Sequence, residues 1–159
     1  MAFRVLDSSA FYAGIPFSSN EPSYITSLIH NEIEHIKKDH DAIQILIETK
    51  RLMICDPEYR FIITANDAAK KSGDFPNLSD EDISTIALSL QLKAELVTDD
   101  FAISNVAKNL GIKVIPVMTS GIKNIVTWKY YCPGCKTDFS KVTECPICGN
   151  RLKRKTMKN

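Results

Sequence analysis

The chain has 159 residues, of which 44% are hydrophobic and 25% are charged, and its formal net charge is +1 at pH 7. This length allows one ordinary domain and one small module that needs a metal ion or another staple for its stability. The N-terminus lacks the long apolar segment of a secretory leader, and no stretch approaches the length of a membrane span, so we expect a cytoplasmic protein with no membrane association.

The near-neutral total conceals two segments of opposite charge. Residues 1–120 contain 11 Lys and Arg against 17 Asp and Glu, a net of −6, whereas residues 121–159 contain 9 against 2, a net of +7. Such a basic segment predicts a polyanionic partner, and the alternative is a tail that only improves solubility.

The first half of the chain predicts strands and helices in alternation. The apolar run Phe3–Leu6 predicts a buried strand that ends at Asp7. After a loop over 14–22, apolar residues recur at helical spacing over 25–36 and again over 42–47, and a second buried strand follows at 52–55.

The second half continues this alternation. Pro57 can open a helix that Gly73 ends, and Ser79 is the expected N-cap of the next helix. A strand over 96–98 precedes a helix that begins at Asp99 and Asp100 and ends at Gly111, and 114–117 is the last strand. Alternation of this kind predicts an α/β fold with a central parallel sheet flanked by helices.

Acidic residues follow the predicted strands. The carboxyl ends of parallel strands meet at one edge of a sheet, which places Asp7, Asp99 and Asp100 together. Glu32 and Asp82, near the starts of helices, can reach the same edge. Clustered carboxylates need a compensating hard cation, and Mg²⁺ or Mn²⁺ is the usual one. Helix capping is the alternative for Asp82, Asp99 and their acidic neighbours Asp80 and Glu81.

Four cysteines near the C-terminus predict a second metal site. They form two C-x-x-C motifs, with nine residues between Cys135 and Cys145, and the outer members are Cys132 and Cys148. Two such knuckles are typical of a structural zinc ribbon with four thiolate ligands. Iron in a rubredoxin-like site is the alternative that spacing alone leaves open, while a redox disulfide fits the paired motifs poorly.

Four sequence segments together resemble the PIN-domain nucleases. They are Val5–Phe11, Ile29–Ile33, Leu78–Leu88 and Leu96–Ala107, and they occur in the order that this family shows. With the four-cysteine motif and the basic tail, the whole chain resembles the Nin-one-binding endonucleases. That family matures the 3′ end of small-subunit ribosomal RNA, so the resemblance implies a divalent-metal-dependent endoribonuclease that leaves 5′-phosphate and 3′-hydroxyl ends.

The resemblance also assigns residues and partners. It implies that Asp7, Glu32, Asp82 and Asp100 are the catalytic, metal-binding acids, with Asp99 as an additional ligand, and that Thr98 and Asn105 belong to the same motif. The implied partners are the precursor of the small ribosomal subunit and possible assembly-factor proteins. The alternatives are a non-catalytic RNA-binding assembly factor and a toxin-like PIN ribonuclease.

The boundaries that we predict are 1–120 for the nuclease domain, 121–126 for a linker and 127–159 for the zinc ribbon with its basic tail. An acidic domain repels a phosphate backbone, so we assign RNA binding to the cations of the ribbon and tail. These are Lys129, Lys136, Lys141, Arg151, Lys153, Arg154 and Lys155. The aromatic residues among these cations are Trp128, Tyr130 and Tyr131. Each could stack on an RNA base or pack against the ribbon or the main domain, and the sequence does not choose between these roles.

Overall fold

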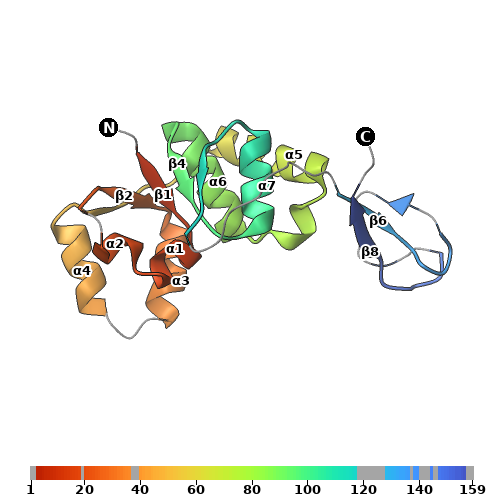
Figure 1. The fold of residues 1–159 in the computed structure, drawn as a ribbon, viewed down its shortest axis with the longest axis horizontal. Helices are drawn as coiled ribbons and strands as arrows, with labels where there is room; N and C mark the ends of the chain where they lie inside the picture. Colours follow the sequence, from red (N-terminus) through yellow and green to blue (C-terminus); the bar gives the residue numbers. More distant parts are fainter. Residues whose placement is uncertain are drawn as a thin grey trace.

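The computed structural model describes residues 3–18, 20–36, 40–117, 128–136, 138–139, 144 and 147–156. In this part of the chain the strands form two separate sheets, one of five strands and one of three (Figure 1). The predicted linker over 121–126 lies outside the described residues. No helix in the described ranges is long and apolar enough to cross a membrane.

The larger sheet is parallel throughout. Its strand order is β3-β2-β1-β4-β5, and each neighbouring pair runs in the same direction. The strands are β1 (Arg4–Leu6), β2 (Ser23–Ile25), β3 (Leu52–Ile54), β4 (Glu95–Val97) and β5 (Val114–Ile115). The predicted α/β fold with a central parallel sheet is therefore confirmed.

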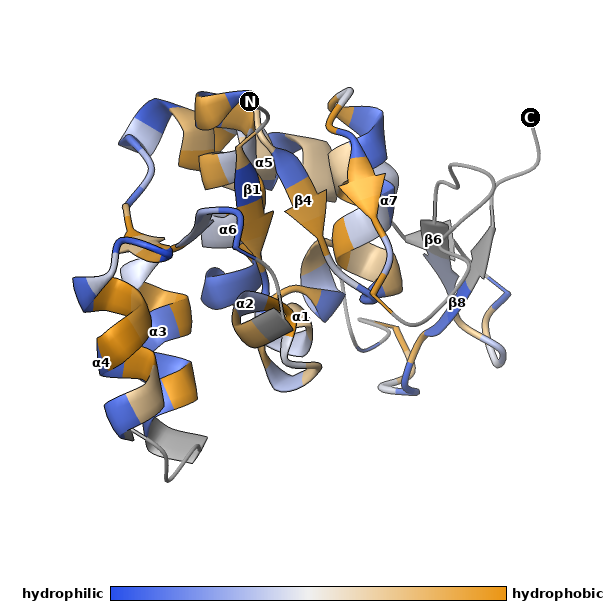
Figure 2. Cartoon of the chain, turned by 60° about the vertical axis from the view of Figure 1, so that its left-hand side comes forward, coloured by the Kyte–Doolittle hydropathy of each residue, from blue (hydrophilic) through white to orange (hydrophobic). Residues whose placement is uncertain are grey.

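Helices cover both faces of this sheet. The chain forms α1 (Ser8–Tyr12), α2 (Ile15–Ser18), α3 (Ser27–Ile36), α4 (His40–Glu48), α5 (Tyr59–Ser72), the 3₁₀ turn η1 (Phe75–Asn77), α6 (Asp80–Leu92) and α7 (Phe101–Asn109). Because side chains alternate along a strand, Val5 and Leu96 pack on the face with α5, α6 and α7, while Leu6 and Val97 pack on the face with α1, α3 and α4. After the charged first residue of each strand, the central strands β1 and β4 are correspondingly apolar (Figure 2).

The first 25 residues differ from the prediction. The expected loop over 14–22 contains α2, α1 precedes it, and Ile25, which we assigned to a helix, ends β2. The strand β2 has only three residues and is followed almost directly by α3. Three residues are too few to show the alternation of apolar and polar side chains that marks a strand, and Ile25 also fits the helical spacing of the apolar residues that follow. The helix α5 also starts later than predicted, because Glu58 is its N-cap and Pro57 lies outside it.

The helix ends that depend on specific capping residues are as predicted. Gly73 closes α5 in the left-handed conformation with φ of 82°, and Gly111 follows α7 with φ of 76°. Ser79 and Asp82 form a complete capping box at the start of α6. These positions were predictable because capping chemistry is local.

The smaller sheet is antiparallel and lies beyond the end of α5 (Figure 1). Its strands are β6 (Trp128–Tyr131), β7 (Asp138–Phe139) and β8 (Lys153–Thr156), in the order β7-β6-β8. Tyr130 of β6 is 8% exposed, and its hydroxyl donates a hydrogen bond to the carbonyl of Gly73. The ribbon therefore contacts the larger α/β domain at the C-cap of α5.

Candidate functional site

The acidic site lies where the strand order of the larger sheet reverses. From the central strand β1 the chain proceeds to β2 and β3 on one side, and it returns as β4 on the other side. Asp7 directly follows β1, and Asp100 comes three residues after β4 ends. In parallel sheets the crevice at such a switch point, outside the carboxyl ends of the strands, is the usual place for a ligand site.

Asp7 is the most constrained of these acids. It is 3% exposed, and its Oδ1 accepts hydrogen bonds from the Ser9 hydroxyl at 2.7 Å and from the Ala10 amide at 2.9 Å. Its Oδ2 accepts a hydrogen bond from the hydroxyl of Thr98 on the neighbouring strand connection. Asp7 is thus the N-cap of α1, a role that the sequence did not suggest, and its carboxylate is fixed from both strands.

Asp100 and Asp82 each belong to a helix start. Asp100 is the N-cap of α7 and accepts a hydrogen bond from the Ile103 amide at 3.0 Å through Oδ1. Asp82 lies in the first turn of α6 and accepts from the Ser79 amide at 2.9 Å through Oδ2. Asp82 also has a hydrogen bond with the Ser79 side chain, whereas no second donor to the Asp100 carboxylate is recorded among the described residues.

Glu32 completes the group from α3. The pKa of Glu32 is raised, first by burial and then by repulsion from Glu81, Asp82 and Asp7, while a hydrogen bond with Ser8 lowers it. The structure therefore places all four predicted acids close enough to interact. Glu81 is an additional member of the cluster that we assigned only to helix capping.

The electrostatics of the cluster favour a bound cation. Burial is the largest cause that raises the pKa of Asp7 and of Asp82, hydrogen bonds lower each pKa, and repulsion by Asp100 raises both. In the described part of the chain, no Lys or Arg forms an ion pair with any of the four acids. Three helix N-termini, those of α1, α6 and α7, contribute the compensation that the fold itself provides.

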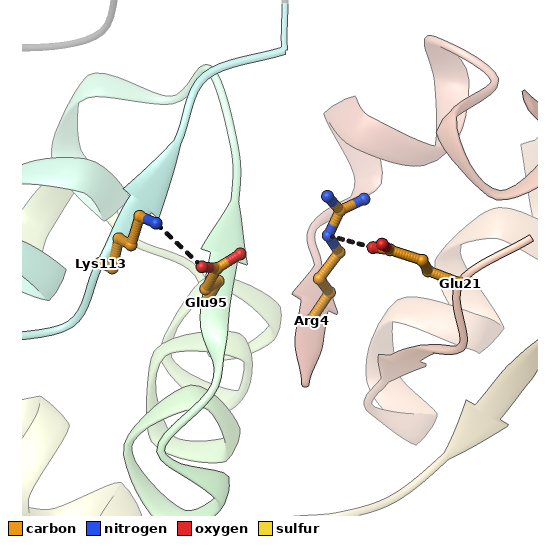
Figure 3. Close-up of polar contacts among 4 residues, drawn as sticks. All are labelled: Arg4, Glu21, Glu95 and Lys113. Carbon is orange, nitrogen blue, oxygen red and sulfur yellow. Dashed lines mark hydrogen bonds and ion pairs between the residues drawn. The ribbon is translucent and has the colours of Figure 1, made fainter. Parts of the chain in front are cut away.

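At the opposite edge of the sheet, the acidic residues do form ion pairs with Lys and Arg. There Arg4 pairs with Glu21 at 3.2 Å, and Lys113 pairs with Glu95 at 3.0 Å (Figure 3). The acids at the amino ends of the strands thus have cationic partners from the protein. Those at the carboxyl ends depend on another source of positive charge.

The acidic oxygens of the described residues do not form a closed ligand shell. In the described residues, the only group of three or more ligand atoms within 4.8 Å of one another is formed by cysteines. The acidic oxygens are therefore more widely spaced than a closed ligand shell. Mg²⁺ retains several waters and is held by few carboxylates, so it needs no closed shell of protein ligands, and carboxylate oxygens suit both Mg²⁺ and Mn²⁺.

Two predicted members of the site have other contacts. Asp99 accepts a hydrogen bond from the Val117 amide at 2.8 Å through Oδ1, so its carboxylate joins the β4 and β5 ends. Asn105 donates to the buried Asp74 at 2.6 Å and links α7 to the turn before η1. Asp100, the other member of this adjacent pair, raises the pKa of Asp7 by repulsion.

Residues with hydroxyl groups support the acids, and most of them were not predicted. Ser9 and Thr98 donate to Asp7, Ser8 bonds Glu32, and Glu32 raises the pKa of Tyr12 in addition to the larger effect of burial. Thr98 was recognised only through the family motif. The run Asp7-Ser8-Ser9 after a strand was the one signal in the sequence that could have identified the serines.

Three of the four predicted cysteine ligands are described, and they are close together. The Sγ atoms of Cys132, Cys135 and Cys148 lie within 4.8 Å of one another, and Cys145 lies outside the described residues. The Sγ atoms of Cys132 and Cys148 are 3.4 Å apart, much longer than a disulfide bond. The Cys135 amide donates to Cys132 Sγ at 3.3 Å, as expected where a thiolate accepts a hydrogen bond. These cysteines could hold a metal ion.

The backbone of the two knuckles is similar at matching positions. Lys136 follows Cys135 with φ of 56°, and Gly149 follows Cys148 with φ of 76°. A side-chain Cβ at Gly134 would meet Asn150 Nδ2 at 2.7 Å, so glycine permits this close approach. Among the described cysteines, Cys132, Cys135 and Cys148 thus converge on one point.

The predicted RNA-binding cations are placed to different extents. Lys136, Arg151, Lys153 and Arg154 are exposed. Lys129 and Lys155 pair across β6 and β8, although their side chains are outside the description, as is all of Lys141. Tyr130 packs against the larger α/β domain. Of the two alternatives for the aromatic residues, packing is therefore the one that holds for Tyr130.

Comparisons with known proteins agree with this geometry. Residues 5–92 match a family model described as the PIN domain of ribonuclease. Endoribonuclease Nob1 of Pyrococcus abyssi is 32% identical over 94% of this chain and 91% of its own length, and Endoribonuclease Nob1 of Methanocaldococcus jannaschii is 36% identical over 100% and 80%. Ribonuclease VapC1 of Thermoplasma acidophilum is 35% identical over 77% of this chain and 63% of its own length.

Proposed function

The chain belongs to the PIN-domain ribonucleases and, within them, to the Nob1 endoribonuclease family, and from this we propose that it cleaves precursor small-subunit ribosomal RNA at the 3′ end during ribosome biogenesis. The observation that supports this proposal most strongly is the group of four acids at the switch point of the sheet. These acids interact with one another and have no ion pair with Lys or Arg among the described residues.

The acids would hold the catalytic cation, and we assign Mg²⁺ or Mn²⁺ to them. Asp7 is fixed by three hydrogen bonds and provides a rigid ligand, while Asp82, Asp100 and Glu32 approach from three helices. When bound, such an ion activates a water for attack on the phosphate and stabilises charge on the leaving 3′ oxygen. The products would carry 5′-phosphate and 3′-hydroxyl ends.

We assign structural zinc to Cys132, Cys135, Cys145 and Cys148. A tetrahedral thiolate site suits Zn²⁺, and the small sheet β7-β6-β8 has few residues with which to form a core of its own. The ribbon would then present its cations to the RNA backbone, and precursor RNA and assembly factors would be the partners. The Nob1 relatives align with most of this chain, ribbon included, whereas the VapC1 match covers 77% of it, which favours this role over a toxin-like one.

Cleavage of a precursor small-subunit RNA fragment tests the proposal. The full chain should cut the fragment at a discrete site with Mn²⁺ and should not cut it with EDTA, and end mapping should give 5′-phosphate and 3′-hydroxyl. Asp7→Asn should abolish cleavage, because the most buried ligand loses its charge. The matched control is Glu95→Gln, at the opposite edge of the sheet, which should cut at the normal rate.

Two results would contradict the proposal. One is cleavage at the normal rate by Asp7→Asn, which would remove the metal-site assignment. The other is RNA binding without cleavage by the wild type under any divalent metal, which would favour the non-catalytic assembly factor.

A further inference from the structure

A pocket lies where the ribbon meets the nuclease domain. Its volume is about 300 Å³, which is at the lower end for small-ligand sites. Residues of η1 form one wall and residues of the ribbon form the other, and the full lining is Pro76, Asn77, Tyr130, Arg151, Leu152 and Arg154.

The lining combines positive charge with apolar surface. Arg151 and Arg154 are exposed cations, and no Asp or Glu is part of the lining. Pro76 and Leu152 contribute apolar surface, and Asn77 contributes an amide that can both donate and accept. This composition suits a ligand with an anionic part, a flat apolar part and a polar edge.

Specific contacts fix the floor of the pocket. The Tyr130 hydroxyl donates to Gly73, and Tyr130 also has a hydrogen bond with the Asn77 side chain. The backbone amide of Asn77 donates to the backbone carbonyl of Asp74 at 2.9 Å. The two walls are therefore held against each other by hydrogen bonds, as a preformed site requires.

The pocket is close to the acidic site along the chain. Asn77 precedes Asp82 by five residues, so their backbones are at most about 18 Å apart even in a fully extended chain. A nucleic acid strand that leaves the acidic site toward the ribbon would reach the pocket within a short length.

We propose that this pocket binds one nucleotide of single-stranded RNA, and this inference rests on the proposed ribonuclease function. Arg151 and Arg154 would bind the phosphate, because guanidinium groups form charge-assisted hydrogen bonds to phosphate oxygens. The base would lie against Pro76 and Leu152 and bond Asn77 through its edge. An unpaired base is required, because base edges in an RNA helix are not accessible to such a pocket.

Binding of RNA by the full chain tests this site separately from cleavage. All variants carry Asp7→Asn and are measured without added Mg²⁺ or Mn²⁺ and without a chelator, so that the ribbon keeps its zinc, with a fluorescent single-stranded RNA and the same strand in a duplex as probes. Asn77→Asp and Leu152→Glu each add a carboxylate, one from each wall, and each should lower single-strand affinity by roughly tenfold or more. The matched control is Asn20→Asp, an exposed position outside the pocket, which should change affinity by no more than about twofold.

A second measurement addresses the phosphate contact. Arg154→Ala should lower the slope of log affinity against log salt by about one. Thermal unfolding of each variant checks that the domain is intact. Asn77→Asp adds a charge and can also weaken the Asn77–Tyr130 hydrogen bond, whereas Leu152→Glu adds a charge and leaves that bond in place. Comparison of the two variants therefore separates the effect of charge from the effect of the lost hydrogen bond.

The possible results are distinct. If Asn77→Asp and Leu152→Glu bind single-stranded RNA as tightly as their parent, or if the duplex loses as much affinity as the single strand, the pocket proposal is wrong. Wild-type cleavage in Mn²⁺ together with such a result overturns the pocket alone. Pocket-dependent binding without any cleavage would instead overturn the proposed function and support the pocket.

Discussion

At the scale of single residues, the two roles of Asp7 both need an ionised carboxylate, and burial opposes that ionisation. As an N-cap it accepts from the Ala10 amide, and as a proposed ligand it must be charged, although it is 3% exposed. Burial raises the pKa of Asp7 above 3.8, and hydrogen bonds from Thr98, Ser9 and Ala10 oppose that change. The hydroxyl groups around Asp7 therefore help to keep it ionised.

Because of this raised pKa, we expect ionisation of Asp7 to lower the unfolding free energy of the protein without Mg²⁺ or Mn²⁺ as the pH rises. Between 3.8 and the raised pKa, folded Asp7 holds more protons than unfolded Asp7, so its contribution to stability falls as pH increases. Without added Mg²⁺ or Mn²⁺, and with the ribbon zinc retained, the unfolding free energy of the wild type relative to Asp7→Asn should therefore decrease as pH rises through this window. Urea unfolding at several pH values measures the difference, and Mn²⁺ should stabilise the wild type more than Asp7→Asn. A difference that grows with pH would contradict the burial of a charge at this position.

At the scale of elements, the start of α6 serves both folding and the acidic site. Ser79 accepts from the Asp82 amide at 3.2 Å, and Asp82 accepts from the Ser79 amide at 2.9 Å. Capping alone explains why an acid occurs here. The interaction of Asp82 with Asp7 and Asp100 is what distinguishes it from an ordinary capping residue.

Two variants separate these roles. Ser79→Ala removes the cap hydroxyl and should lower the unfolding free energy by about 1 kcal/mol while cleavage is largely retained. Asp82→Asn keeps an oxygen that can accept from Ser79, so it should affect stability less and cleavage far more, by at least about tenfold. Thermal unfolding and single-turnover cleavage provide the two measurements. Equal cleavage by Asp82→Asn and wild type would reduce Asp82 to a capping residue.

At the scale of the whole molecule, one tyrosine joins the two modules. Tyr130 is buried, and its hydroxyl bonds the carbonyl that ends α5. The burial of Tyr130 and its position at the joint mean that the ribbon, the C-cap of α5 and η1 form a continuous surface. The orientation of the cations relative to the acids depends on this joint.

Removal of that hydroxyl should loosen the joint without unfolding either module. Tyr130→Phe should reduce the free energy of docking by about 1 kcal/mol, the usual net value of a hydrogen bond. Trp128 is the only tryptophan and lies on the same strand, so its fluorescence anisotropy reports on the ribbon, and it should decrease. Tyr59→Phe, which alters an exposed side chain on α5, is the control. Unchanged anisotropy would show that the hydroxyl does not hold the modules together.

The sequence alone determined the features that depend on local chemistry. Runs of apolar residues identified β1, β3, β4 and β5, and capping signals identified the ends at Gly73 and Ser79, because these patterns act within a few residues. The paired cysteine motifs predicted a metal site, because thiolates in a short loop converge by turn geometry. The order of predicted strands placed the acids at one edge of the sheet, and the family motif then assigned their roles.

Only the tertiary structure decided which side chains meet. The hydrogen bond from Thr98 to Asp7 spans 91 residues of chain, and it exists because β1 and β4 are neighbours in the sheet. The same order of strands places Asp100 beside Asp7 and leaves Asp99 with Val117. The contact of Tyr130 with Gly73, and the pocket beside it, likewise depend on where two modules touch, which no local pattern encodes. The sequence thus determined the chemical groups, and long-range packing determined their arrangement.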